Sequence, residues 1–142
     1  MKPEEKARVK IDQWLTDAGW KVINRDEFEA NSSAVAVREG LLKGNKEADY
    51  FLFINGKAIG VLEAKREEID VTQQTVCEQI EGYARGVPSY YTAYQKPLPF
   101  LYTSNGKHLY FRDFRKEKSD YEEISVMHKP KRMVDMLGIE DP

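Results

Sequence analysis

The chain has 142 residues, with 22 Lys and Arg against 24 Asp and Glu, so its formal net charge is −2. Hydrophobic residues make up 41% and charged residues 32%, which excludes a chain too polar to collapse and one too apolar to stay dissolved. The apolar run 50–54 is too short to span a membrane, and the single cysteine, Cys77, cannot form an internal disulfide. We therefore expect one domain in a reducing, cytoplasmic setting, and the slightly acidic composition does not by itself suggest DNA as a partner.

Helical and extended patterns alternate along the chain. Residues 3–18 predict an amphipathic helix, because Ile11, Trp14, Leu15 and Ala18 fall on one stripe before Gly19. After a short extended piece at 20–23 and a polar stretch at 24–33, the apolar patterns predict a series of strands. These strands are expected at 35–42, 50–54 and 58–65, with turns at 43–46 and 55–56, and later at 100–103 and 109–112 around the turn 104–107.

Two further helices complete the prediction. Residues 71–85 carry an apolar stripe, with Asp70 or Thr72 as the expected cap, and a shorter helix is expected from Pro130. The run 50–54 is apolar at every position, as in a central strand buried on both faces. The order predicts an α/β fold, in which a central mixed β-sheet is flanked by helices in three layers.

Charged residues occur where they are least expected, at the ends of two apolar strands. Asp49 comes directly before the strand 50–54, and Glu63 and Lys65 close the strand 58–65. Because side chains alternate along a strand, Val61, Glu63 and Lys65 share one face. A charged group leaves water at a high cost unless it is paired or binds a metal.

Whether Asp49 shares that face depends on the turn. If Asn55 and Gly56 form a two-residue loop, Asp49 lies opposite Leu62 and points away from Glu63. If the loop is 54–56, with a bulge at Gly56, Asp49 lies opposite Val61 and diagonal to Glu63, with Cβ atoms roughly 7 Å apart. The sequence allows both loops, and only the second brings the carboxylates together.

Two neighbouring carboxylates with a lysine suit the hydrolysis of a phosphodiester. Mg²⁺ takes hard oxygen ligands, often one or two carboxylates with phosphate and water. Lys65 would orient the attacking water or stabilise the developing negative charge. The alternative is a solvent-exposed ion pair of Glu63 and Lys65 at a strand end.

These residues resemble a known nuclease signature. Asp49, thirteen residues and then Glu63-Ala64-Lys65 match the D…(D/E)xK pattern of restriction-endonuclease-like nucleases, with Ala48 in place of the usual proline. The surrounding stretch 47–66 resembles the nuclease domain of the restriction (R) subunit of type I restriction-modification enzymes. The resemblance implies a restriction-endonuclease-like fold (PD-(D/E)xK), Asp49, Glu63 and Lys65 as catalytic residues, and Mg²⁺ held by Asp49 and Glu63.

The resemblance extends to other residues. Gln79-Ile80-Glu81-Gly82-Tyr83 matches the Q-x-x-x-Y element of this family, which implies that Gln79 and Tyr83 position DNA. The alternative is that Tyr83 belongs to the core and Gln79 to its edge. Arg38-Glu39 matches an Arg-Glu pair that precedes the motif, so Glu39 is a candidate further acid.

The resemblance also implies an assembly. We expect a nuclease domain over residues 1–128 and the start of a linker toward a motor domain over 129–142, since the chain stops before any phosphate-binding loop. The implied partners are double-stranded DNA and the methyltransferase (M) and specificity (S) subunits, with ATP used by motor domains outside this chain. The alternatives are a non-catalytic docking module and a stand-alone nuclease of the same fold. The intact Asp49, Glu63 and Lys65 favour a catalytic domain.

Overall fold

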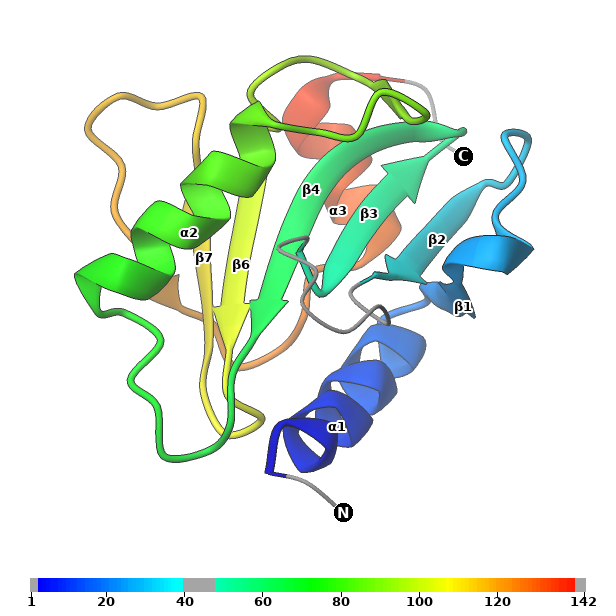
Figure 1. Ribbon diagram of the computed structural model, residues 1–142. Coiled ribbons are helices and arrows are strands. Elements are labelled where there is room, and N and C mark those ends of the chain that lie inside the picture. Colours follow the sequence, from blue (N-terminus) through cyan, green and yellow to red (C-terminus); the bar gives the residue numbers. More distant parts are fainter. Residues whose placement is uncertain (1–2, 40–47, 140–142) are drawn as a thin grey trace.

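Within the described residues, a mixed sheet of eight strands forms the centre of the molecule, and helices cover both of its faces (Figure 1). The computed structural model describes residues 3–39 and 48–139. The helices are α1 (Pro3–Asp17), α2 (Gln74–Arg85), α3 (Pro130–Leu137) and the short 3-10 helix η1 (Arg25–Glu27). The strands are β1 (Lys21–Asn24), β2 (Ala34–Arg38), β3 (Tyr50–Ile54), β4 (Lys57–Ala64), β5 (Thr92–Ala93), β6 (Phe100–Ser104), β7 (Leu109–Asp113) and β8 (Glu122–Glu123).

The sheet is mixed because three of its described strand pairs are parallel, β1 with β2, β4 with β5 and β4 with β6. The strand order is β1-β2-β3-β4-β6-β7-β8, and β5 pairs with the start of β4. β1 pairs in parallel with β2, and β4 in parallel with β6, while β2, β3 and β4 are antiparallel neighbours. The predicted central strand 50–54 is confirmed as β3, and all five of its residues are buried. The expected α/β class with a mixed sheet is therefore confirmed.

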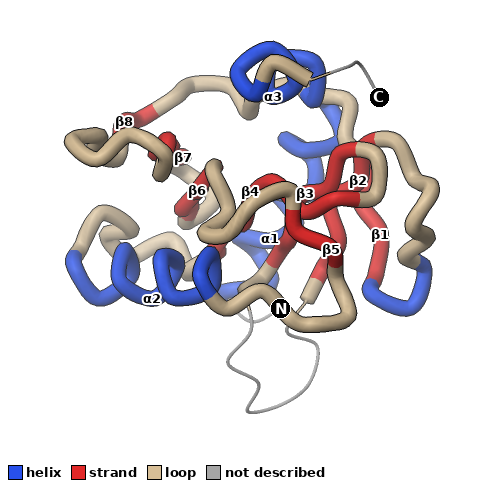
Figure 2. The backbone as a smooth tube through the Cα atoms, turned by 90° about the horizontal axis from the view of Figure 1, so that it is seen from above, coloured by secondary structure: helices blue, strands red, loops and turns tan. Residues whose placement is uncertain are grey.

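Two hydrophobic clusters lie on opposite sides of the sheet. Figure 2 shows α2 on one side of the sheet and α3 on the other. The cluster under α2 joins Ile80 and Ala84 to Phe51 and Val61, and we call this side the α2 face. The other cluster joins Leu15 of α1 and Met133 of α3 to alternating sheet residues such as Leu52 and Leu62, and we call this side the α1 face.

Helix α2 begins later than the sequence predicted. Its first residue is Gln74 rather than Val71, and the residue before it, Gln73, makes no capping bond with its side chain. The expected caps are occupied elsewhere, because the Asp70 carboxylate accepts hydrogen bonds from the Thr72 backbone N–H (2.9 Å) and hydroxyl (2.6 Å). This local turn competes with the first helical turn, and the prediction of a cap at Asp70 or Thr72 was wrong.

Other boundaries differ by a few residues. The strand predicted at 35–42 is described at its start as β2, and its last residues, like the predicted turn 43–46, lie outside the described residues. β5 and β8 were not predicted, because two residues are too short to show an alternating pattern. The predicted helices at the two ends of the chain are confirmed as α1 and α3.

The turn between β3 and β4 combines the two predicted possibilities. Asn55 (φ 51°) and Gly56 (φ 80°) both have positive φ, and Ile54 pairs with Lys57, so the loop has two residues. A Cβ atom on Gly56 would lie 2.0 Å from the backbone oxygen of Ala30, which explains the glycine. Two residues later the register shifts, since Phe53 pairs with Ala58 but Leu52 pairs with Gly60. The bulge therefore lies in β4 at Ile59 rather than in the turn itself.

Candidate active site

The bulge in β4 decides where the two acids point. Beyond it Tyr50 pairs with Leu62, and one step further along this register Asp49 stands opposite Glu63. Both side chains lie on the α2 face. Asp49 is two residues from Phe51 and Glu63 is two residues from Val61, and side chains two residues apart on a strand point to the same face. The sequence allowed two arrangements of Asp49 and Glu63, either diagonal to each other or on opposite faces of the sheet. The structure shows neither of them. The acids are direct cross-strand neighbours, and they are 8% and 3% exposed.

Asp49 is held by one neutral and one charged donor. The backbone N–H of Ala64 donates to Asp49 Oδ2 at 2.7 Å, which ties the start of β3 to the end of β4. The Arg8 guanidinium donates to Asp49 Oδ1 and forms an ion pair with it. Arg8 belongs to α1, which packs against the α1 face, so its side chain reaches Asp49 where β3 begins.

Glu63 is the less compensated of the two acids. Burial, and then the adjoining Asp49 carboxyl group, hold the pKa of Glu63 well above its usual range, and Lys65 and Arg8 oppose that shift. The two carboxyl groups are close enough to share a proton. Glu63 Oε2 is buried and has no hydrogen-bond donor among the described residues. A buried oxygen atom without a hydrogen-bond donor lowers the stability of the folded protein, so such an atom calls for a functional explanation.

A second unpartnered oxygen lies beside Glu63. Thr103 of β6 is the parallel register partner of Glu63, and its side chain is fully buried on the α2 face. Its Oγ1 atom has no hydrogen-bond partner within residues 3–39 and 48–139. Two carboxyl groups and a hydroxyl thus lie together at the end of β4. Two of their oxygen atoms, Glu63 Oε2 and Thr103 Oγ1, form no hydrogen bond with the described residues.

Lys65 connects this cluster to an open groove. Its backbone N–H donates to the Ser104 carbonyl at 2.9 Å, so the residue continues the pairing of β4 with β6. The groove has a volume of about 750 Å³, and its lining includes Lys65, Arg66, Gln73, Thr75 and Gln79. A groove with cationic and amide side chains offers donors to phosphate oxygens.

Gln79 and Tyr83 form a pair on α2. Gln79 Nε2 donates to the Tyr83 hydroxyl oxygen at 3.0 Å, which leaves the Tyr83 O–H available as a donor. Burial, and then the nearby Glu63 carboxyl group, raise the pKa of Tyr83 to about 12. The Tyr83 hydroxyl is therefore near enough to the acids to be affected by their charge, and Gln79 lines the groove together with Lys65.

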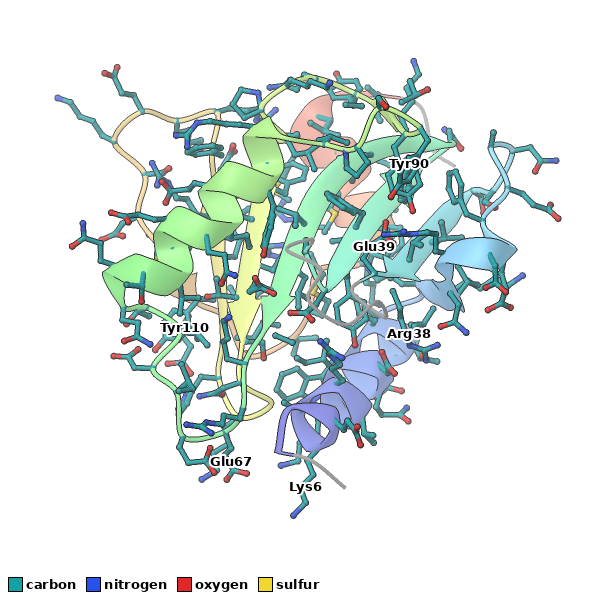
Figure 3. All side chains as sticks on the ribbon, viewed as in Figure 1. Lys6, Arg38, Glu39, Glu67, Tyr90 and Tyr110 are labelled. Carbon is teal, nitrogen blue, oxygen red and sulfur yellow. The ribbon has the colours of Figure 1, made fainter. Side chains whose placement is uncertain are left out.

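Glu39 lies in line with the acids but is engaged elsewhere. Its backbone N–H donates to the Asp49 carbonyl at 2.7 Å, and its buried carboxylate accepts from Arg25 Nε at 2.7 Å. Figure 3 shows Glu39 below Tyr90, and the Arg25 guanidinium lies 5.5 Å from the centre of the Tyr90 ring. No group of three or more His, Cys, Asp and Glu side chains within the described ranges is arranged to hold a metal ion. The other carboxylate oxygen of Glu39, Oε1, is buried without a hydrogen-bond partner among the described residues, so Glu39 stays a candidate further acid.

Sequence reasoning missed two residues of this site. Arg8 lies on α1, far from the motif in sequence, and nothing in its spacing marks it. Thr103 was predicted only as the last residue of a strand. Its position beside Glu63 depends on the register between two parallel strands, which local sequence does not reveal.

Comparison with known proteins identifies the family. The family profile for the second domain of the type I restriction enzyme EcoKI endonuclease subunit matches residues 24–137, most of the chain. The chain belongs to this family of type I restriction enzyme endonuclease subunits. The EcoKI endonuclease subunit of Escherichia coli K12 is 28% identical to this chain over an alignment 185 residues long. The alignment covers 96% of this chain and 16% of the relative. The chain thus spans about a sixth of the length of this curated relative.

Two solved structures share the fold. A fragment assigned to an HsdR subunit of a type I restriction enzyme from Vibrio vulnificus YJ016 matches with a TM-score of 0.61 and 23% identity. That match covers 99% of this chain and 27% of the other. The type IIG restriction endonuclease BpuSI matches with a TM-score of 0.54 and 18% identity, over 88% of this chain and 13% of the other. A restriction-endonuclease-type fold is therefore shown.

Proposed function

We propose that this chain carries the Mg²⁺-dependent DNA-cleaving site of a type I restriction enzyme, with Asp49, Glu63 and Lys65 as catalytic residues. The observation that carries the proposal is the direct cross-strand pairing of two buried carboxyl groups, one with an oxygen that has no donor. Two adjacent buried carboxyl groups destabilise a fold unless a cation binds between them.

The donor set suits a hard divalent cation. Asp49 and Glu63 offer carboxylate oxygens, and a Mg²⁺ site commonly uses one or two carboxylates and completes its shell with water and phosphate. When bound, the cation would polarise the scissile phosphate and lower the pKa of the attacking water. No helix within the described residues is both apolar and long enough to cross a membrane.

The remaining side chains act on the substrate. Lys65 lines the groove, and its charge acts on Glu63, so it supplies a positive charge where negative charge develops on the phosphate. The Gln79 amide, at the groove, holds the DNA backbone near Lys65. The Tyr83 O–H, with its oxygen bound by Gln79, donates to a phosphate oxygen.

We also propose the assembly that the family implies. Residues 1–128 form the nuclease domain and 129–142 begin a linker toward ATP-driven motor domains. The substrate is double-stranded DNA, brought by the M and S subunits in the cytoplasm. Since the formal charge of this chain is −2, most contacts with DNA phosphates would come from those other parts.

A matched pair of acids tests the site. Asp49 and Asp113 are each 8% exposed, and each is paired with an arginine, Arg8 and Arg115. Asp49→Asn should abolish Mg²⁺-dependent plasmid cleavage by the complex with M and S subunits and ATP. Asp113→Asn removes an equally buried carboxylate away from the site, so cleavage should persist whenever the variant is folded. Undiminished cleavage by Asp49→Asn would disprove the proposed site.

A further inference from the structure

A cation from the protein itself already occupies the site. The Arg8 guanidinium contacts Asp49 Oδ1, and the other oxygen of Asp49 is bound by the Ala64 N–H. Arg8 also lowers the pKa of Glu63, so its charge acts on both acids. It stands where a divalent cation would neutralise the same pair.

The position of Arg8 is built into the fold. One turn further along α1, the Asp12 carboxylate accepts hydrogen bonds from the Tyr50 hydroxyl (2.6 Å) and from Arg38 Nη2 (2.9 Å). Tyr50 is the residue after Asp49, so this network fixes α1 against the start of β3. The Arg8 side chain is 30% exposed, which leaves it a path toward solvent and substrate.

We infer that Arg8 is a positioning residue that competes with the divalent cation for Asp49, so that it weakens metal binding until DNA is present. The inference rests on the proposed function, because it assumes that Asp49 and Glu63 bind the metal. Two cations cannot share Asp49 Oδ1 without strong repulsion at low dielectric. Arg8 must therefore leave when the metal binds, and a DNA phosphate is the anion that would receive its guanidinium.

This exchange couples metal binding to DNA binding. Without DNA, displacing Arg8 breaks an ion pair and leaves a guanidinium near a doubly charged ion. With DNA, the phosphate compensates both cations. The coupling would restrain metal-dependent cleavage when no substrate is positioned in the groove.

The test measures metal affinity in the absence of DNA. Mn²⁺ binding to the 142-residue chain is followed by electron paramagnetic resonance of the free ion and by calorimetry. Arg8→Met keeps the length and apolar stem of the side chain, and it should bind Mn²⁺ at least about tenfold more tightly than the native chain. Lys10→Met, which removes the same charge from an exposed position on α1, should change affinity by less than about twofold.

Failure of the inference and failure of the proposed function give different results in this test. Native binding that Asp49→Asn abolishes, with equal or weaker binding by Arg8→Met, overturns the role of Arg8 and leaves the metal site standing. Absence of Mn²⁺ binding by both the native chain and Arg8→Met overturns both. If Arg8→Met does not fold, the test is made on the native chain by following the NMR resonance of the Arg8 Nε–H group. That resonance should shift when Ca²⁺ saturates the site, and an unchanged resonance refutes the exchange.

Discussion

The two faces of the sheet differ in whether their buried polar groups have hydrogen-bond partners. On the α1 face, the Tyr50 hydroxyl donates to Asp12, and the Tyr102 hydroxyl pairs with His128 Nδ1 at 2.7 Å. On the α2 face, near the ends of β4 and β6, Glu63 Oε2 and Thr103 Oγ1 are buried without a partner in the described part of the chain. Buried polar groups in a structural core are satisfied, so the unsatisfied face is the one adapted to a ligand.

The comparison also explains the placement of the positive charges. On the α1 face the network of Tyr50, Asp12 and Arg38 is internally neutralised and anchors α1. On the α2 face Lys65 opens onto the groove, and Arg8 reaches the acids from α1. Changes on the α2 face should therefore affect chemistry more than stability, and changes on the α1 face should do the reverse.

The largest effect is expected at Lys65. Lys65→Ala in the full enzyme should reduce DNA cleavage by about 10²–10³-fold, because one donor to the transition state is lost. The motors lie in other domains, so ATP hydrolysis should be unchanged. Cleavage and ATPase rates on the same preparation test this, and cleavage at the native rate would remove Lys65 from the mechanism.

On the α1 face, the strongest test is Tyr102. Burial raises the pKa of Tyr102 and lowers that of His128, so both the hydroxyl and the ring are kept neutral in the hydrogen bond between them. Tyr102→Phe leaves His128 Nδ1 without its hydrogen-bond partner and should cost about 1–3 kcal/mol of unfolding free energy. Denaturant titration measures the loss. A folded Tyr102→Phe enzyme that no longer cut DNA would break the division between the faces.

A smaller effect is expected at the Gln79 and Tyr83 pair. Gln79 is exposed, so Gln79→Ala should change the unfolding free energy by less than about 0.5 kcal/mol. If it positions DNA, cleavage should fall by about tenfold, and Tyr83→Phe should weaken cleavage while the fold is kept. Melting temperature and cleavage are measured on both variants. A joint loss of stability and activity in Gln79→Ala would show that the residue is structural.

Thr103 sharpens the comparison within the sheet itself. Thr103→Val replaces a buried hydroxyl that has no partner with a methyl group of similar size. Stability should stay constant or rise by up to about 1 kcal/mol. If the hydroxyl holds a water of the active site, cleavage should fall severalfold at the same time. A lower melting temperature would mean that the hydroxyl has a structural role.

The smallest effect concerns pH and His128. Burial, and then Arg132, lower the pKa of His128 below its usual value of 6.5 in the folded chain. The unfolded chain therefore binds more protons just below pH 6.5, so this residue stabilises the fold fully above that pH and loses its contribution as pH falls toward the folded pKa. His128→Gln should have a flatter dependence of stability on pH in that window. An equal slope in both proteins would contradict the assignment.

Much of the site was readable from local sequence. The apolar run of β3, the Asn55-Gly56 turn and the charged residues that end β4 each depend on neighbours along the chain. The D…(D/E)xK pattern and the Q-x-x-x-Y element led to the family that the comparisons then confirmed. The start of α2 was misjudged for an equally local reason, the turn formed by Asp70 with Thr72.

The tertiary structure decided which of these residues meet. A strand has a period of two, so a shift of one residue sends every later side chain to the other face, and the bulge at Ile59 makes that shift. The position after it is tightly packed, since a Cβ atom on Gly60 would lie 3.1 Å from the Phe100 carbonyl oxygen. Packing of β4 between β3 and β6 thus sets Asp49 opposite Glu63 and Thr103 beside it. The contact of Arg8 with Asp49 likewise exists because α1 docks on the sheet, and no spacing along the chain encodes that meeting.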